Sequence, residues 1–155
     1  MEQRDCAGGN DAAAHAAAKA LYESEATSRA WSICFEDAGA GWARGAMVVR
    51  KDMLNGHGTV HGAMIFALAD TVFAWACNSD NVRSVAQQAS ISFLSPANPG
   101  ETLSAVARED AKTGRTGVYT VTVTGVDERV IAVFQGLART IGGAVIDRDA
   151  PQNND

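Results

Sequence analysis

The chain of 155 residues lacks the features that mark several large classes of protein. Its three cysteines, Cys6, Cys34 and Cys77, are widely spaced and form no CxxC pair, which argues against a disulfide framework and a zinc site. No cluster of five or more basic residues occurs and the net charge is −5, so nucleic acid is not expected as a partner. No apolar run reaches the ~18 charge-free residues of a membrane-spanning helix. We therefore expect reduced thiols, no nucleic acid and no membrane.

The N-terminus also lacks the pattern of a secretory signal. Glu2, Arg4 and Asp5 precede any apolar run, whereas a signal needs a basic start and a stronger apolar stretch. A cytoplasmic location is expected on this basis. Length and composition predict one domain over residues 11–146, preceded by a flexible segment at 1–10 and followed by a polar, flexible tail at 147–155.

Periodicity predicts a helix, two strands, a second helix and then four strands. The alanine-rich segment 11–27 predicts a helix capped by Asn10 or Asp11, and residues 62–78, apolar on all sides, predict a buried helix. The stretch YTVTVT alternates as a half-buried strand does, and short connections make such strands antiparallel neighbours. Strands are expected at Trp31–Glu36 and Trp42–Val49 and within RSVAQQASISFLSP, ETLSAVARED, GVYTVTVTG and RVIAVFQGLARTIGG. The fold class is α+β, and the layout that fits is the hot-dog fold, a curved antiparallel sheet around one long central helix.

Common catalytic and cofactor motifs are missing. The stretch GHGTVH at 56–61 approaches GxGxxG, but the third glycine is a histidine and no βαβ unit surrounds it, which excludes dinucleotide binding. No GxSxG is present, and no histidine lies near a cysteine. His57 and His61 are four residues apart and Asp70 could be a third metal ligand. The neighbouring glycines predict a loop there, however, so neither a metal nor another cofactor is expected.

A single carboxylate, Asp70, interrupts the apolar segment 63–77. None of its helical neighbours at three or four residues is a cation. Two interpretations stay open: the carboxylate accepts a hydrogen bond from the backbone of another element, or it lies desolvated in an apolar cleft beside Phe66 and Phe73 and is more basic for it.

The start of the same helix is a candidate oxyanion hole. The first backbone N–H groups of a helix have no internal partner, and glycine at position 62 lets a ligand approach them. Gly62 and Asp70 are eight residues apart, about 12 Å along the helix axis at ~1.5 Å per residue. One carbonyl carbon cannot contact both. A functional site therefore predicts a homodimer in which Asp70 of one chain faces Gly62 of the other.

The segment MLNGHGTVHGAMIFALADTVFAWACNSD closely resembles the signature of hot-dog acyl-CoA thioesterases of the phenylacetic-acid-degradation (PaaI-type) family. The pattern is an Asn-Gly loop, a His-Gly pair and Leu-Ala-Asp in the central helix. The likeness continues through ISFLSP, TGVY and RTIGG and covers roughly residues 31–143.

The resemblance implies roles for four residues in catalysis. Asp70 would be the nucleophile or general base, and the Gly62 N–H the oxyanion donor. Asn55 would orient the thioester or water, and His61 would shape the pocket. Family members are dimers that commonly pair into tetramers and need no metal.

The sequence departs from the family pattern at two positions. Ala63 stands where a second glycine is usual, and Ser95 stands where relatives often carry a basic residue. Lys112 and Arg115 are possible substitutes for that base, although solvated hairpin charges explain them as well. The candidate substrate and CoA contacts are His57, Ala63, Phe73, Arg115, Thr116 and Gly117.

The resemblance favours hydrolysis of phenylacetyl-CoA or ring-hydroxylated phenylacetyl-CoA to free acid and CoA, within phenylacetate catabolism. Two alternatives stay open. One is a non-catalytic acyl-CoA-binding or regulatory hot-dog protein, which would release no thiol. The other is a hot-dog hydratase, which would depend on His61 rather than Asp70.

Overall fold

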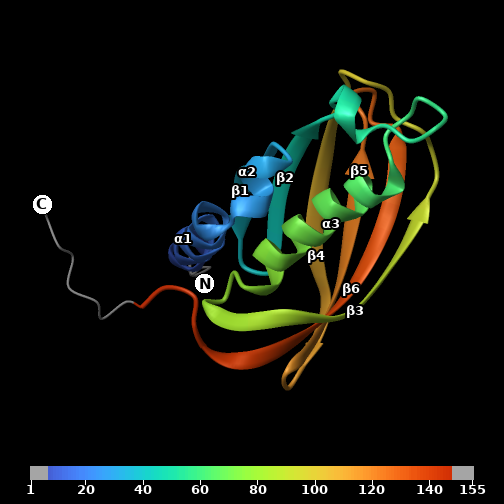
Figure 1. Ribbon diagram of the computed structural model, residues 1–155. Helices are drawn as coiled ribbons and strands as arrows, with labels where there is room; N and C mark the ends of the chain where they lie inside the picture. Colours follow the sequence, from blue (N-terminus) through green and yellow to red (C-terminus); the bar gives the residue numbers. More distant parts are fainter. Residues whose placement is uncertain (1–6, 148–155) are drawn as a thin grey trace, which may run out of the picture.

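The computed structural model describes residues 7–147 and forms a curved antiparallel sheet with one long helix in its concave face (Figure 1). The sheet has six strands in the order β1-β2-β4-β5-β6-β3. The strands are β1 (Ile33–Gly39), β2 (Trp42–Val48), β3 (Val82–Phe93), β4 (Thr102–Thr113), β5 (Thr116–Thr124) and β6 (Val130–Ala144). Strands β1 and β3 are the two edges. This is the predicted α+β hot-dog fold.

The central helix α3 (Gly62–Cys77) crosses all six strands and supplies much of the core. In β5, every second residue from Gly117 to Val123 is buried, because side chains of a strand alternate between the two faces of a sheet. The concave face meets α3 in aromatic contacts: Phe73 lies with its ring centroid 5.5 Å from Tyr119 and 5.6 Å from Phe134. Gly136 leaves room for Phe73, since a Cβ there would lie 2.7 Å from the ring.

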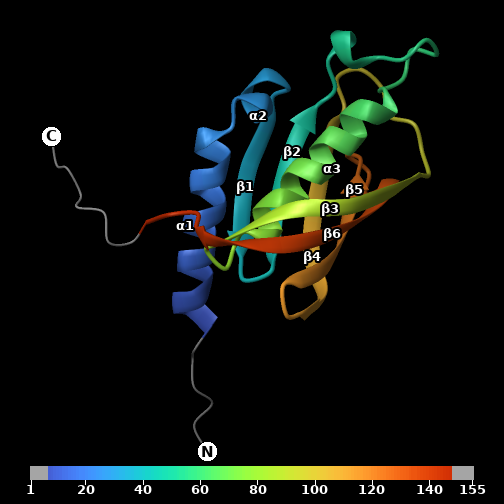
Figure 2. The same ribbon diagram turned by 60° about the horizontal axis from the view of Figure 1, so that its bottom comes forward.

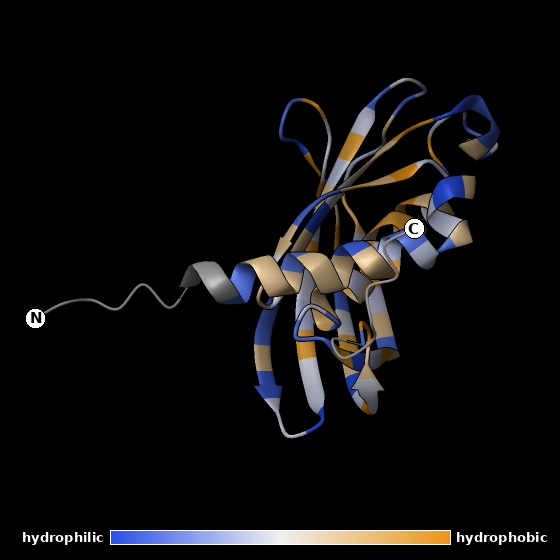
Figure 3. Ribbon diagram, turned by 90° about the vertical axis from the view of Figure 1, so that its left-hand side faces the viewer, coloured by the Kyte–Doolittle hydropathy of each residue, from blue (hydrophilic) through white to orange (hydrophobic). Residues whose placement is uncertain are grey.

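The N-terminal helix packs beside β1 and not in the sheet's concave face (Figure 2). Helix α1 (Ala7–Ser24) is followed by the short helix α2 (Ala26–Ala30), with an extended residue, Glu25, between them. Tyr22 of α1 contacts Phe35 and Trp75 at centroid distances of 5.9 and 5.6 Å. Figure 3 looks onto α1 and shows its mildly hydrophobic surface running along the side of the sheet.

Two expectations for the N-terminus were wrong. The helix predicted over 11–27 begins at Ala7 and is divided at Glu25, so residues 7–10 belong to α1. Asp11 does not cap a helix: its Oδ1 accepts a hydrogen bond from the Ala40 N–H at 3.0 Å. The remainder of the predicted N-terminal segment and the tail after residue 147 lie outside the described residues.

The predicted strand Trp31–Glu36 also differs, because Trp31 ends α2 and Ser32 has a positive φ of 55°. The strand therefore begins at Ile33 and continues to Gly39. The other elements agree with prediction to within a few residues at each end, and α3 to within one.

Candidate active site

Helix α3 is buried around most of its circumference, and beyond its first turn one stripe is partly open. Gly62, Phe66, Asp70 and Ala74 follow one another at intervals of four residues, and each is of intermediate exposure. Residues at this spacing lie on one face of a helix. The carboxylate that interrupts the apolar segment therefore lies on the same face as the helix's first residue.

Asp70 has no hydrogen-bond or ion-pair partner among residues 7–147. The first interpretation, a carboxylate held by the backbone of another element, therefore finds no support in this chain. Burial raises the pKa of Asp70 above its ordinary value, and the negative charge of Glu25 raises it further. A desolvated carboxylate is a stronger base and nucleophile than a solvated one.

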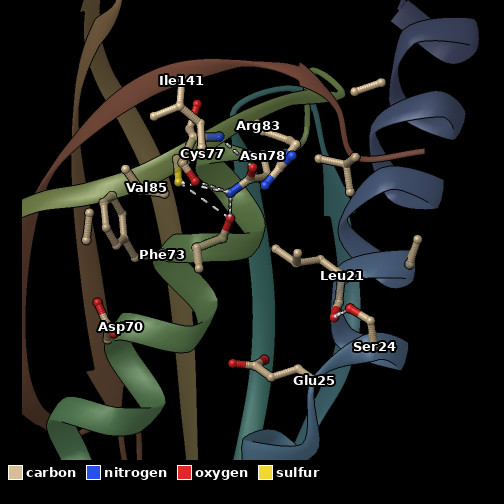
Figure 4. A pocket seen from close by; sticks show the side chains of 16 residues that line it. Leu21, Ser24, Glu25, Asp70, Phe73, Cys77, Asn78, Arg83, Val85 and Ile141 are labelled. Atoms are coloured by element: carbon tan, nitrogen blue, oxygen red, sulfur yellow. Dashed lines mark hydrogen bonds between the residues drawn. The ribbon is translucent and has the colours of Figure 1, made fainter. Parts of the chain in front are cut away.

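Asp70 lies on the wall of a cavity of about 770 Å³, which we call the carboxylate cavity (Figure 4). Its walls come from α3, from the end of α1, and from β3 and β6. Apolar side chains, among them Leu21, Phe73 and Ile141, dominate the lining, and Glu25 and Arg83 are the charged side chains besides Asp70. This volume and lining suit an apolar acyl group.

The start of α3 forms a second hollow of about 380 Å³, which we call the helix-start groove. His61 is the N-cap, and its Nδ1 accepts a hydrogen bond from the Ala63 N–H at 3.0 Å. The Gly62 N–H has no acceptor within the described part of the chain. A Cβ at Gly62 would lie 3.0 Å from the Phe93 ring, so glycine keeps the groove open.

Asn55 holds together the loop that leads into this groove. Its side-chain Oδ1 accepts hydrogen bonds from the backbone N–H groups of His57, at 2.9 Å, and Thr59, at 3.3 Å. Its Nδ2 donates to Thr59 Oγ1 at 3.0 Å. Asn55 also lines the groove, whereas His57 is exposed and lines none of the hollows described here. Asn55 and Gly62 thus line the same groove, and a role for the Asn55 amide in orienting the thioester or water stays a prediction.

The single chain does not bring all predicted residues into one site. Asp70 lines the carboxylate cavity, while Asn55 and Gly62 line the helix-start groove. Phe73 borders the carboxylate cavity, but it is only 1% exposed and serves mainly as core. Ala63 is exposed and its backbone is bound to the His61 ring.

The β4–β5 hairpin lies apart from both hollows. The Arg115 Nε donates to the Thr140 carbonyl at 3.0 Å, which ties the hairpin to β6. Gly117 is buried against Tyr119, and Thr116 begins β5. Lys112 pairs with Asp80 at 2.6 Å. A CoA contact for Arg115, Thr116 or Gly117 stays a prediction.

Two side chains at these hollows were not singled out from the sequence. Glu25 reaches the carboxylate cavity only because α1 folds back along the sheet, and no local pattern signals this. Phe93 belongs to the apolar pair Phe93–Leu94, which is 53% and 61% exposed beside the groove, and an exposed apolar pair ending a strand could have marked it.

Within residues 7–147, no three His, Cys, Asp or Glu side chains gather closely enough to hold a metal ion. In the same range, no helix is both long and apolar enough to cross a membrane. Cys77 is buried and burial raises its pKa to about 12, whereas Cys34 is exposed; both are free thiols.

Comparison with known proteins agrees with this arrangement. Residues 57–132 match the family model described as the thioesterase superfamily. The chain is 39% identical over 128 residues to the acyl-coenzyme A thioesterase PaaI of Escherichia coli, covering 83% of this chain and 91% of that protein. The solved structure of the E. coli PaaI protein superposes with a TM-score of 0.85 at 38% identity, covering 87% and 98% of the two chains.

A Streptococcus mutans protein solved with acetyl CoA bound has a TM-score of 0.70 at 26% identity, covering 72% of this chain and 90% of that one. The fold and the site thus define a hot-dog thioester hydrolase. The chain belongs to the PaaI family of acyl-CoA thioesterases, within the thioesterase superfamily.

Proposed function

We propose that this thioesterase hydrolyses phenylacetyl-CoA or ring-hydroxylated phenylacetyl-CoA to the free acid and CoA, within phenylacetate catabolism. The observation that carries the proposal is Asp70, a partly buried carboxylate that has no partner among the described residues and lies on the wall of a largely apolar cavity. The cavity suits a flat apolar acyl group, and the similarity to the E. coli enzyme supports the substrate class. The cytoplasmic location stays a prediction.

The proposed active site is shared between two protomers. The thioester oxygen would accept a hydrogen bond from the Gly62 N–H of one protomer, while Asp70 of the partner subunit acts on the carbonyl carbon. Asp70 would either attack that carbon or take a proton from the attacking water. In both routes the C–S bond breaks and CoA leaves as a thiolate that then takes up a proton. After attack by Asp70 itself a mixed anhydride remains, and water would hydrolyse it to the free acid and restore the Asp70 carboxylate. Asn55 would orient the thioester or the water, and His61 would fix the first turn of α3.

Three features of the single chain support a dimer. Asp70 and Gly62 occupy separate hollows on the same stripe of α3, so neither hollow is a complete site by itself. Strand β3 is a sheet edge, and edges are ready to pair with another chain. The exposed Phe93 and Leu94 lie at the end of that edge. We propose antiparallel packing of two α3 stripes across a two-fold axis, with dimers paired into a tetramer.

A thiol-release assay over a panel of acyl-CoA substrates tests the reaction. Phenylacetyl-CoA and its hydroxylated forms should give the highest kcat/KM, and straight-chain acyl-CoA of similar size a lower one. A higher kcat/KM for the straight chains would overturn the proposed substrate, and binding without thiol release would favour a regulatory protein. Label found in Asp70 after a single turnover in ¹⁸O-water would identify the nucleophilic route, in which water opens the anhydride at the Asp70 carbonyl, because a general base directs all of the label into the product acid.

A mixing experiment tests the shared site. An Asp70→Ala protomer keeps Gly62, and a Gly62→Pro protomer keeps Asp70 but lacks the N–H donor. If each site uses both protomers, a mixed dimer contains one intact site, and an equilibrated mixture should recover about a quarter of wild-type activity. Each variant alone should be nearly inactive. No recovery in a mixture shown to contain mixed dimers would place both groups of a site in one protomer.

A further inference from the structure

We propose that Glu25 is a positioning residue for the reaction, acting through Asp70. The Glu25 side chain lines the same carboxylate cavity as Asp70. Its negative charge disfavours the ionised form of Asp70. By this means Glu25 would keep Asp70 a stronger base than the cavity alone would make it. The inference rests on the proposed function, because it takes Asp70 as the reacting carboxylate.

The fold holds Glu25 in place at the break between α1 and α2. Its backbone N–H donates to the Tyr22 carbonyl at 3.2 Å, and its own backbone is extended with φ −95° and ψ 110°. The Ser28 hydroxyl, which is fully buried, donates to Glu25 Oε2 at 2.6 Å. Ser28 therefore fixes the carboxylate and leaves its other oxygen free of hydrogen bonds to the described residues.

Helix α1 is anchored firmly enough to keep Glu25 at this point. Tyr22, three residues earlier, contacts Trp75 of α3 edge-to-face at 5.6 Å. His15 Nδ1 lies 2.9 Å from Asp37 Oδ1 of β1. In Figure 4 the Glu25 side chain extends from the α1–α2 break toward α3, on the side of the cavity where Asp70 lies.

The other titratable groups that line the cavity lie toward the end that is far from Asp70. Arg83 of β3 lies beside Asn78 and Cys77 in Figure 4, and Asn78 is eight residues beyond Asp70, about 12 Å along the helix axis. Cys77 is an uncharged thiol at neutral pH, since its pKa is raised to about 12. The lining from β6 carries no titratable side chain. Glu25 is thus the charged group that acts on Asp70, and it adds to the effect of burial on the Asp70 pKa.

The experiment is the pH dependence of kcat for thiol release from phenylacetyl-CoA, with Glu25→Gln as the test variant. Removing the negative charge should lower the pKa of Asp70, so the acidic limb of the profile should move to lower pH. Plateau kcat should fall a few-fold because the base is weaker. Glu25→Asp, which keeps the charge, should restore the wild-type limb.

Glu23→Gln is the matched control, because Glu23 is an exposed carboxylate of α1 that pairs only with Lys19, at 3.9 Å, and does not line the cavity. It should leave the limb unmoved. If the Gln variant of Glu25 is poorly folded by thermal denaturation, Glu25→Ala gives the same test. A reduced kcat with an unmoved limb in a folded variant would mean that Glu25 is merely structural and would overturn the proposal. Turnover in Asp70→Ala would instead overturn the proposed function.

Discussion

The two ends of the open stripe on α3 differ in the chemistry that they offer. At the start, Gly62 presents a backbone N–H in a shallow groove next to an exposed loop and an exposed phenylalanine. Two turns later, Asp70 presents a carboxylate in a larger and mainly apolar cavity under α1. The first can stabilise negative charge on a substrate oxygen, and the second can attack or remove a proton. We call these two ends the helix-start level and the carboxylate level, and the proposed mechanism uses both.

The carboxylate level should contribute most to the rate. Asp70→Ala should lower kcat/KM by about 10³-fold or more, because it removes the proposed base or nucleophile, and the other carboxylate of the cavity, Glu25, is held by the Ser28 hydroxyl. Thiol release by the purified oligomer measures the loss, and size-exclusion chromatography checks the assembly. Asp70→Asn keeps the size without the charge and should be as inactive. Wild-type turnover in either variant would show that the Asp70 carboxylate contributes nothing to the rate.

The helix-start level should contribute less to the rate. Two variants separate the effect of the Gly62 N–H donor from the effect of the open space that glycine leaves there. Gly62→Pro removes the N–H, and proline is well tolerated at the first position of a helix when the preceding residue is extended, as His61 is with ψ 137°. We expect kcat to fall about 10²-fold. Gly62→Ala keeps the donor but brings a Cβ within 3.0 Å of Phe93, and should cost about ten-fold or less.

Gly56→Ala is the control for these variants, since a Cβ there would meet nothing within 4 Å. It should leave kcat within two-fold of wild type. Equal losses in Gly62→Pro and Gly62→Ala would show that space, not the donor, is what the helix start provides.

Asp70, unlike the Gly62 N–H, should also affect the stability of the folded protein. Because the pKa of Asp70 is raised in the folded state, ionised Asp70 opposes folding, and its cost appears as the pH rises from the ordinary value near 3.8 through the raised one. Asp70→Asn should therefore raise Tm by a degree or two at pH 7 and by less at pH 4. Differential scanning fluorimetry at the two pH values measures this. A gain that is equal or larger at pH 4 would contradict the raised pKa.

The smallest effect is expected away from both levels, at the β4–β5 hairpin. Arg115→Gln removes a hydrogen bond to the Thr140 carbonyl but no group that lines either hollow. KM for acyl-CoA should rise by less than about three-fold if solvated hairpin charge is the whole role of Arg115. A larger rise with unchanged kcat would show that the hairpin holds a CoA phosphate and would make it a third region of the site.

The same two levels were predictable from the sequence to different degrees. Asp70 was visible as a charge in an apolar segment, and α3 was located within one residue because apolar residues surround it on all sides. The Gly62 donor followed from its place at a helix start. Glu25 was hidden, since its role depends on α1 folding against β1 through contacts such as Tyr22 with Phe35, which no local pattern specifies.

The errors near the N-terminus have a related cause. Asp11 has a residue type that favours helix caps, but its carboxylate binds the Ala40 N–H, 29 residues away. Likewise, the predicted strand at Trp31 gave way to a turn in which Ser32 has a positive φ. In both places a contact or a turn set by the tertiary fold prevailed over local preference.

The position of α1 has a consequence for how such an enzyme can diverge. Gly62 and Asp70 both fall within residues 57–132, the part that matches the superfamily, and Asn55 lies two residues before it. Leu21 and Glu25, which close the carboxylate cavity, come from a helix outside that part. The proposed reacting groups therefore lie in the matched part, while one wall of the proposed acyl cavity comes from the N-terminal helix and the residue that follows it. Changes in the N-terminal helix can reshape the acyl wall while leaving the groups that cleave the thioester in place, which makes this helix the natural target for redesigning substrate range.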